Sequence, residues 1–136
     1  MKQHPGVFFA GQISGVEGYT ESIAMGMLAG INVARISKGL TAIPPPRETA
    51  LGSLVHYICH AEAKNFQPAN ITFDLLPQVD ENTRRRVRDK EQRHQMVCQN
   101  ALQALEKWLA EISEVATLPE HSAHSAPEGE RGLTAK

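Results

Sequence analysis

The chain has 136 residues, of which 41% are hydrophobic and 21% charged, and its formal net charge is −1. This composition excludes a fibrous or wholly disordered protein, and the length suits one modest domain whose core needs no metal or disulfide. The length also excludes a complete, large doubly wound enzyme that uses a dinucleotide. Because the net charge is near zero, any attraction to nucleic acid must come from a local patch of cations.

Cysteine usage and hydropathy predict the compartment. Cys59 and Cys98 are far apart and form no CxxC motif, which argues against a disulfide framework or a cysteine-based zinc module. No targeting segment or membrane-spanning run is visible in the sequence. We therefore expect a soluble protein in a reducing, cytoplasmic setting.

The N-terminal third predicts a strand, a glycine loop and a helix. Residues 7–10, Val-Phe-Phe-Ala, form a short apolar run typical of a strand buried on both faces. Three glycines in the next eight residues predict a loop. From about Tyr19 to Ser37 apolar side chains recur at helical spacing, and Lys38 with Gly39 gives a basic last turn and a terminating glycine.

Two glycines, Gly26 and Gly30, lie inside this predicted helix. Each costs roughly 1 kcal/mol of helix stability relative to alanine, so their presence needs a reason. One reason is close packing of the helix on a sheet or on another helix. The other is that something large, such as a cofactor or a partner domain, lies against the helix.

The rest of the chain predicts mainly helix. The three prolines at 44–46 form a stiff connector, and residues 47–60 carry the apolar stripe of a second helix. Residues 66–73 are typical of a loop that enters a short strand. Residues 83–115 predict a third helix, first basic and then amphipathic. Residues 117–136 have almost nothing to bury and predict a disordered tail.

The glycine loop is the best candidate for a ligand site. Its spacing is neither the GxGxxG fingerprint nor a P-loop, but its amides precede a helix, whose positive end attracts phosphate or a developing anion. Tyr19 could stack on a planar ligand, and Glu17 could accept a hydrogen bond from a hydroxyl or ring N–H. The alternative is a tight strand-to-helix turn in which Ser14 and Glu17 form a capping box.

A histidine and cysteine cluster is a weaker candidate for chemistry. His56 and His60 lie at helical spacing with Cys59 beside them, but a zinc site needs three or four converging ligands. Packing or surface exposure is the favoured interpretation of this cluster, so we predict no metal site. No base can be paired with Cys59, so we predict no cysteine nucleophile.

A basic segment lies between residues 84 and 93, where six cations accompany two acids. The six cations are Arg84, Arg85, Arg86, Arg88, Lys90 and Arg93. Guanidinium groups at this density suit phosphate contacts, which supply affinity without sequence reading. The alternative is a solvated helix face on which Asp89 and Glu91 pair with the cations.

Several of these stretches together resemble one family. Residues 8–19, Phe-Phe-Ala-Gly-Gln-Ile-Ser-Gly-Val-Glu-Gly-Tyr, closely resemble the C-terminal flavin loop of the folate- and FAD-dependent tRNA uracil-5-methyltransferases. Residues 26–35 are similar to the helix that follows it. The remaining similar stretches are Pro-Arg-Glu-Thr-Ala-Leu-Gly at 46–52, Phe-Gln-Pro-Ala-Asn at 66–70, Leu-Leu-Pro at 75–77, and Arg-Asp-Lys at 88–90 with Arg93.

A sister family shares part of this pattern. These are the flavoproteins that place a carboxymethylaminomethyl group on the tRNA wobble uridine, and they share the Gly-Gln-Ile, Gly-Tyr and Ala-Gly-Ile-Asn frame. Val16-Glu17-Gly18 and the Phe-Gln-Pro segment favour the first family. The sister family stays as an alternative, as does a non-catalytic helical module that binds RNA.

The resemblance implies a fold that is mainly α with a few short strands (α+β). Residues 1–43 would be the last strand, glycine loop and helix of a doubly wound α/β FAD-binding domain. Residues 44–116 would form a helical C-terminal segment, followed by the tail at 117–136. The residues implied to bind FAD are Gly11, Gln12, Ile13, Gly15, Glu17, Gly18 and Tyr19.

The resemblance also implies a reaction. In this family methylenetetrahydrofolate gives a one-carbon unit to C5 of a T-loop uridine in tRNA, with electrons from reduced FAD and NAD(P)H. The implied partners are tRNA, which the basic segment would face, and the remainder of the FAD-binding domain. Met25 and Asp74 depart from the family pattern. There is no GxGxxG motif, and neither cysteine falls on a matching motif, so we assign no catalytic residue and expect the isolated chain to be inactive.

Overall fold

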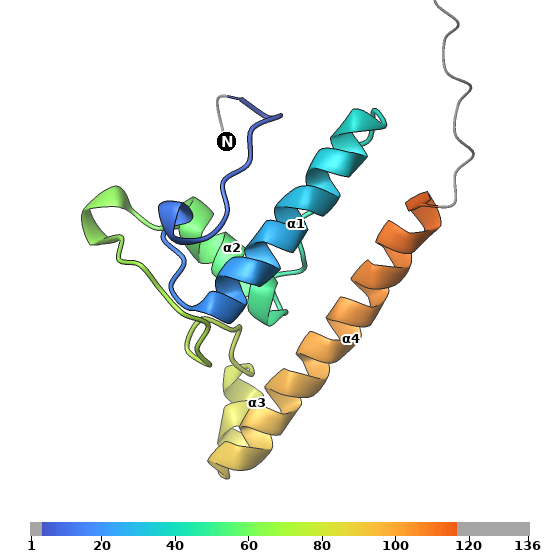
Figure 1. Ribbon diagram of the computed structural model, residues 1–136. Coiled ribbons are helices and arrows are strands. Elements are labelled where there is room, and N and C mark those ends of the chain that lie inside the picture. The colour runs from blue at the N-terminus through green and yellow to red at the C-terminus, as the bar shows by residue number, and fades with distance from the viewer. Residues whose placement is uncertain (1–3, 117–136) are drawn as a thin grey trace, which may run out of the picture.

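The computed structural model describes residues 4–116, and the side chains of residues 4–113. These residues form four α-helices, and Figure 1 shows the longest running the length of the molecule. The helices are α1 (Tyr19–Ser37), α2 (Ala50–His60), α3 (Glu81–Arg86) and α4 (Lys90–Ala116). Two single turns of 3-10 helix, η1 (Gln12–Ser14) and η2 (Ala63–Asn65), lie in the connections. The predicted tail lies outside the described residues.

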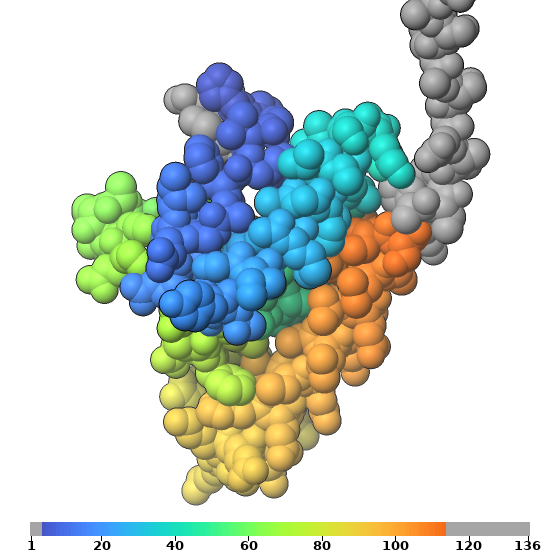
Figure 2. All heavy atoms as spheres, in the orientation of Figure 1, coloured from blue at the N-terminus to red at the C-terminus, as the bar shows by residue number. Residues whose placement is uncertain are grey.

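One small core joins the glycine loop to three helices. Val16 comes from the loop, Met25 and Leu28 from α1, Leu54 from α2 and Trp108 from α4. Burial of these side chains is the main force that holds the helices together, because apolar surface removed from water contributes about 25 cal/mol per Å². Figure 2 shows α1 and α4 in contact near their C-terminal ends on the face it presents.

The first helix has the predicted bounds. Its end follows from Gly39, whose φ of 75° suits glycine, and from Leu40, whose N–H donates to the Arg35 carbonyl at 3.0 Å. The buried Asn32 then directs the chain back along the helix, because its Oδ1 accepts from the Ile43 N–H at 2.8 Å. Residues on both sides of this turn, such as Leu28 and Ile43, therefore pack in or against the core.

The second helix begins at Ala50, three residues after the predicted start at residue 47. Thr49 is the N-cap, and its hydroxyl accepts from the Gly52 N–H at 2.9 Å while donating to the Pro46 carbonyl at 2.7 Å. Residues 46–49 are thereby held in a turn that precedes the helix. A capping threonine fixes a helix start more strongly than the apolar stripe does.

The predicted strands are wrong. Within residues 4–116 the backbone forms no strand, and the one isolated bridge pairs Val16 with Ala69 in parallel. Residues 7–10 are not buried on both faces either, since Val7 is 44% and Phe9 50% exposed. An apolar run becomes a strand only beside another strand that accepts its hydrogen bonds, and none lies beside it in the described residues. The prediction of a mainly helical chain is confirmed.

The predicted third helix is two helices. The backbone leaves helical geometry at Val87, where φ is −103° and ψ is 94°. Arg93 stabilises the backbone at this break, because its Nη1 donates to the carbonyls of Val87 at 2.9 Å and Arg88 at 2.6 Å. Asp89 then accepts from the Glu91 N–H at 2.9 Å and starts α4. The basic segment is therefore divided between two helices.

None of the described helices combines the length and apolarity that crossing a membrane requires.

Candidate functional site

The glycine loop is a compact turn in which three glycines take conformations that other residues avoid. Gly11, Gly15 and Gly18 have φ angles of 73°, 84° and 87°. Between them the Ser14 hydroxyl donates to the Gly11 carbonyl at 2.7 Å, and Val16 is 1% exposed in the core. The buried valine anchors the loop, while the glycines allow the backbone to reverse around it.

The loop is fastened to a segment that lies far along the sequence. The Glu17 N–H donates to the Ala69 carbonyl, and the Ala69 N–H donates to the Gly15 carbonyl, both at 3.0 Å. A Cβ atom on Gly15 would overlap the ring of Phe66. Two of the family-like motifs, the glycine loop and the Phe-Gln-Pro-Ala-Asn segment, are therefore one structural unit.

The second helix supports this unit through Tyr57. Its ring stacks on Phe66 with 5.7 Å between centroids. Its hydroxyl donates to the Gln67 carbonyl at 2.8 Å and accepts from the Gln67 N–H at 3.2 Å. The sequence patterns gave Tyr57 no role. The partners of Tyr57, Phe66 and Gln67, belong to the Phe-Gln-Pro motif, which the sequence analysis did identify. The sequence alone does not show which residues that motif contacts.

The N-terminus of α1 carries no side-chain cap from the described residues. Gly18 is the N-cap, with φ of 87° and ψ of 143°. The capping box that was the alternative interpretation of this loop does not form, because the Ser14 hydroxyl donates to the Gly11 carbonyl and the helix begins only at Tyr19. Glu21 lies in the first turn and accepts from the Ile71 N–H at 3.3 Å. An anionic ligand at this end would meet free helix amides on one side and this carboxylate on the other.

The residues predicted to bind FAD differ in their exposure to solvent. Gly15 is buried, and the space beside it is taken by Phe66, so its role within the described residues is to pack the loop. Gly11 is partly buried. The others are exposed, most strongly Ile13 at 78% and Tyr19 at 91%. These exposed residues are Gln12, Ile13, Glu17, Gly18 and Tyr19.

A predominantly apolar groove adjoins the loop. It has a volume of about 540 Å³ and lies between the N-terminal segment, α1 and α2. Its lining includes Phe9, Ile13, Ala29, Pro44 and Ile58. A planar, largely apolar ring system fits such a surface, and of the residues predicted to bind FAD Ile13 is in its lining. The apolar lining of the groove thus suits an isoalloxazine, whereas the space beside Gly15 is already occupied by Phe66.

One face of α1 is left uncovered by the described residues. Tyr19, Ile23 and Met27 recur at helical spacing and are 91%, 74% and 61% exposed. A Cβ atom at Gly26 or Gly30 would meet nothing within 4 Å. Packing inside the described chain therefore does not explain these two glycines, which leaves the interpretation that a larger body lies against the helix.

The basic segment is exposed, but its cations are not equivalent. Arg85 pairs with Glu81 at 3.3 Å, and Arg93 is used to hold the break between α3 and α4. Among the described residues no ion pair involves the other four predicted phosphate contacts, and all four are exposed. These are Arg84, Arg86, Arg88 and Lys90. The alternative interpretation paired these cations with Asp89 and Glu91, but among the described residues the one acid pair in the segment is between Arg85 and Glu81, and Asp89 accepts from the Glu91 N–H instead.

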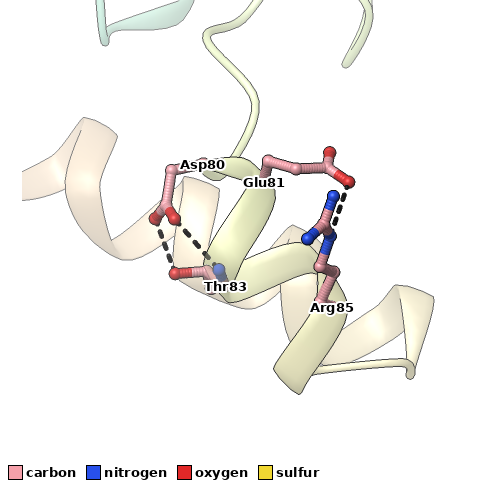
Figure 3. Close-up of polar contacts among 4 residues, drawn as sticks. All are labelled: Asp80, Glu81, Thr83 and Arg85. Carbon is pink, nitrogen blue, oxygen red and sulfur yellow. Dashed lines mark hydrogen bonds and ion pairs between the residues drawn. The ribbon is translucent and has the colours of Figure 1, made fainter.

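Asp80 fixes the start of α3, as Figure 3 shows. Its carboxylate accepts from the Thr83 N–H at 3.0 Å and from the Thr83 hydroxyl at 2.6 Å. The side-chain bond from Thr83 is the largest cause that holds the pKa of Asp80 below its usual value of 3.8. Because this cap fixes the helix, it also fixes the direction in which the arginines of α3 project.

The histidine cluster has the geometry of a surface feature. The rings of His56 and His60 stack with 4.4 Å between centroids, and Cys59 beside them is exposed. Partial desolvation, with the nearby His60 and Arg47 charges, lowers the pKa of His56 below 6.5. Over the described residues no group of three or more His, Cys, Asp or Glu side chains is placed to hold a metal ion.

Comparison with known proteins gives the same family as the resemblance. A family model described as "Glucose inhibited division protein A" matches residues 1–41. The chain is 67% identical over 110 residues to the methylenetetrahydrofolate–tRNA-(uracil-5-)-methyltransferase TrmFO of Koribacter versatilis, covering 81% of this chain and 25% of that protein. It is 60% identical to the TrmFO of Solibacter usitatus, covering 79% and 24%. It is 48% identical to that of Streptococcus sanguinis, with the same two shares.

The identity lies between 48% and 67% over about four-fifths of this chain. The chain spans about a quarter of the length of the curated relatives it matches. The resemblance seen in the motifs is thereby confirmed, and the chain belongs by sequence to the family of the methylenetetrahydrofolate–tRNA-(uracil-5-)-methyltransferases.

Proposed function

We propose that this chain is the C-terminal part of a flavoenzyme that methylates C5 of a T-loop uridine in tRNA, with methylenetetrahydrofolate as the one-carbon donor. The observation that carries this proposal is the direct contact between the glycine loop and the Phe-Gln-Pro-Ala-Asn segment at residues 66–70. Two stretches that resemble the same family, and that are far apart in sequence, hydrogen-bond to each other directly. Sequence identity to the TrmFO proteins over four-fifths of the chain supports it.

In this proposal the glycine loop forms one side of the flavin pocket. Gln12, Glu17 and the amides at the start of α1 would supply hydrogen bonds to the ring system, and Ile13 with Tyr19 would supply apolar contact. FAD, when bound and reduced, would provide the electrons for the methyl transfer. The positive end of α1 would stabilise negative charge next to it, since the helix amides there lack side-chain partners among the described residues.

The remainder of the flavoprotein would cover the exposed face of α1. Ile23 and Met27 are the apolar contacts it would bury, and Gly26 with Gly30 would permit close approach of its backbone. Because Cys59 and Cys98 fall on none of the family-like motifs, the catalytic residues would lie in that remainder. We therefore propose that the isolated chain does not methylate tRNA.

The basic segment would contact tRNA. Arg84, Arg86 and Arg88 are exposed and lack ion-pair partners among the described residues, which favours phosphate contacts. The second candidate function rests on the same observation: a non-catalytic helical module that binds RNA without flavin. The two candidates differ in whether the chain contributes to flavin binding.

A reconstitution experiment tests the proposal. The chain is mixed with the Koribacter versatilis relative from which the matching region has been deleted, and flavin retention and tRNA methylation are measured. We expect neither part alone to methylate tRNA, and we expect the mixture both to retain flavin and to methylate. Methylation by the chain alone would contradict the assignment of catalysis to the remainder.

Matched variants make the flavin role specific. Tyr19→Ser removes a side chain that is 91% exposed, so it should leave folding unchanged and weaken flavin retention in the mixture. Leu109→Ser, on α4 and 44% exposed, is the control and should retain flavin normally. Equal retention by both variants would remove Tyr19 from the pocket. If the mixture retains no flavin but the chain binds tRNA, the second candidate function is the correct one.

A further inference from the structure

The guanidinium of Arg35 is buried where the C-terminal half of α1 meets α4. Only 8% of the residue is exposed, and its Nε donates to the Thr41 carbonyl at 2.9 Å. Its Nη1 is enclosed and has no hydrogen-bond partner among the described residues. Buried polar groups in folded proteins are nearly always hydrogen-bonded, so an unpartnered donor on a cation points to a missing acceptor.

This arginine lines a groove that carries positive charge on apolar walls. The groove has a volume of about 320 Å³, at the lower end of the range for small-ligand pockets. Ile31, Ala34, Leu40 and Ile112 make its apolar lining. Lys38 contributes a second cation and Ser113 a hydroxyl, and no carboxylate is among the described residues that line it.

Neither cation is neutralised within the described part of the chain, whose two ion pairs involve Lys64 and Arg85. The groove beside Trp108 differs, because there Glu48 and Glu111 accompany Lys107. Keeping an uncompensated guanidinium away from water is costly, and a planar carboxylate matches its forked donors. The apolar walls select a ligand whose carboxylate is attached to an apolar chain.

We infer that this groove binds a monocarboxylate with a short apolar chain, and that Arg35 is the residue that recognises the carboxylate. The apolar chain lies between α1 and α4 against Ile31 and Ile112, and Lys38 at the rim adds attraction. This site is separate from the glycine loop and does not rest on the proposed flavin function. A phosphate ester fits the groove less well, because its larger charge would be enclosed by apolar walls.

Calorimetric titration of the full chain with hexanoate, hexanol and hexylamine tests the inference. Hexanoate should bind saturably, while hexanol and hexylamine should not. Arg35→Met keeps the length and apolar character of the side chain and should weaken hexanoate binding about tenfold or more, because a hydrogen bond to a charged group contributes about 1.5–3 kcal/mol. Hexanoate binding that is equal in Arg35→Met, or equal to hexanol binding, would overturn the inference.

A second variant keeps the test decisive if Arg35→Met does not fold, which circular dichroism will show. Ala34→Leu fills part of the groove from an exposed helix position and leaves Arg35 in place. It should also reduce hexanoate affinity, whereas Ala110→Leu, an exposed alanine on α4 that is not among the lining residues, should not. Equal affinity in the two leucine variants would place hexanoate elsewhere and overturn the inference.

Discussion

The ring of Phe66 occupies the space beside Gly15 that a side chain would otherwise fill. This contact joins the glycine loop to a segment that follows the second helix, and two backbone hydrogen bonds between Gly15, Glu17 and Ala69 extend it. Gly15 is therefore needed for two reasons, the absence of Cβ and its φ of 84°. The loop that we propose to contact the flavin is shaped by residues that would not touch it.

Replacing Gly15 by alanine should destabilise the chain. The left-handed conformation costs a residue with a Cβ about 1–2 kcal/mol, and displacement of the Phe66 ring adds to that cost. Urea unfolding followed by circular dichroism measures the loss in free energy of unfolding. The double variant Gly15→Ala, Phe66→Ala should lose less than the sum of the two single variants, because the alanine then meets no ring. Strict additivity would contradict the contact.

Gly26→Ala should have the opposite effect. Gly26 lies inside α1, and a Cβ there would meet nothing within 4 Å. Alanine should raise the free energy of unfolding of the isolated chain by about 1 kcal/mol, as expected for an exposed helix interior. In the reconstituted mixture, a leucine at position 26 should weaken assembly, because the proposed partner approaches there. Normal assembly with Gly26→Leu would show that this face is not the contact.

Thr49→Ala should shift the start of α2. The Thr49 hydroxyl is the cap of this helix, and the same residue is bound to the Pro46 carbonyl. Removing a threonine cap costs about 0.5–2 kcal/mol, which thermal or urea unfolding can resolve. Thr49→Ser retains the hydroxyl and should recover most of the loss. A serine variant as unstable as the alanine variant would mean that the methyl packing, not the cap, matters at this position.

The sequence predicted the elements whose signals are local. The bounds of α1 follow from Gly18 before it and Gly39 after it, and both signals depend on near neighbours. The break between α3 and α4 was not predicted, because it depends on Arg93 reaching back to the carbonyls of Val87 and Arg88. Helical periodicity continues across such a break and gives no sign of it.

The same distinction applies to the site. The glycine loop and the basic segment were found from residue types alone, but the support of the loop by Phe66 and Tyr57 depends on contacts between distant segments. The strand predicted at residues 7–10 was wrong for the related reason that a strand requires a neighbour. Composition indicates which residues are apolar, and it does not indicate which partner strand they will meet.

The start of α3 should depend on pH. Thr83 holds the pKa of Asp80 below 3.8, so the folded state favours the charged carboxylate. The cap therefore contributes its full stabilisation above about pH 4 and loses it as the pH falls through the lowered pKa. The pH dependence of the NMR chemical shift of the Asp80 carboxyl carbon measures this pKa directly. In Thr83→Ala the pKa should rise toward its usual value, and an unchanged titration would contradict the bond drawn in Figure 3.

Replacing Arg84 and Arg86 by glutamine should weaken tRNA binding. Both are exposed cations without ion-pair partners among the described residues, so each is available for a phosphate. For every phosphate that the variant no longer binds, the slope of log affinity against log salt should fall by about 0.7–0.9. The matched control is Lys64→Gln with Lys107→Gln, which removes the same charge from exposed positions outside the basic segment.

Fluorescence anisotropy of labelled tRNA at several salt concentrations separates the outcomes. The Arg84, Arg86 variant should bind tRNA more weakly than the parent, most clearly at low salt, where counterion release contributes most, and its salt slope should be smaller. The control should retain nearly the parental slope, because net charge alone exerts a weak, screened attraction. Equal reductions in both variants would mean that tRNA senses only overall charge. The basic segment would then be a solvated surface, and the tRNA contact of the family would lie elsewhere.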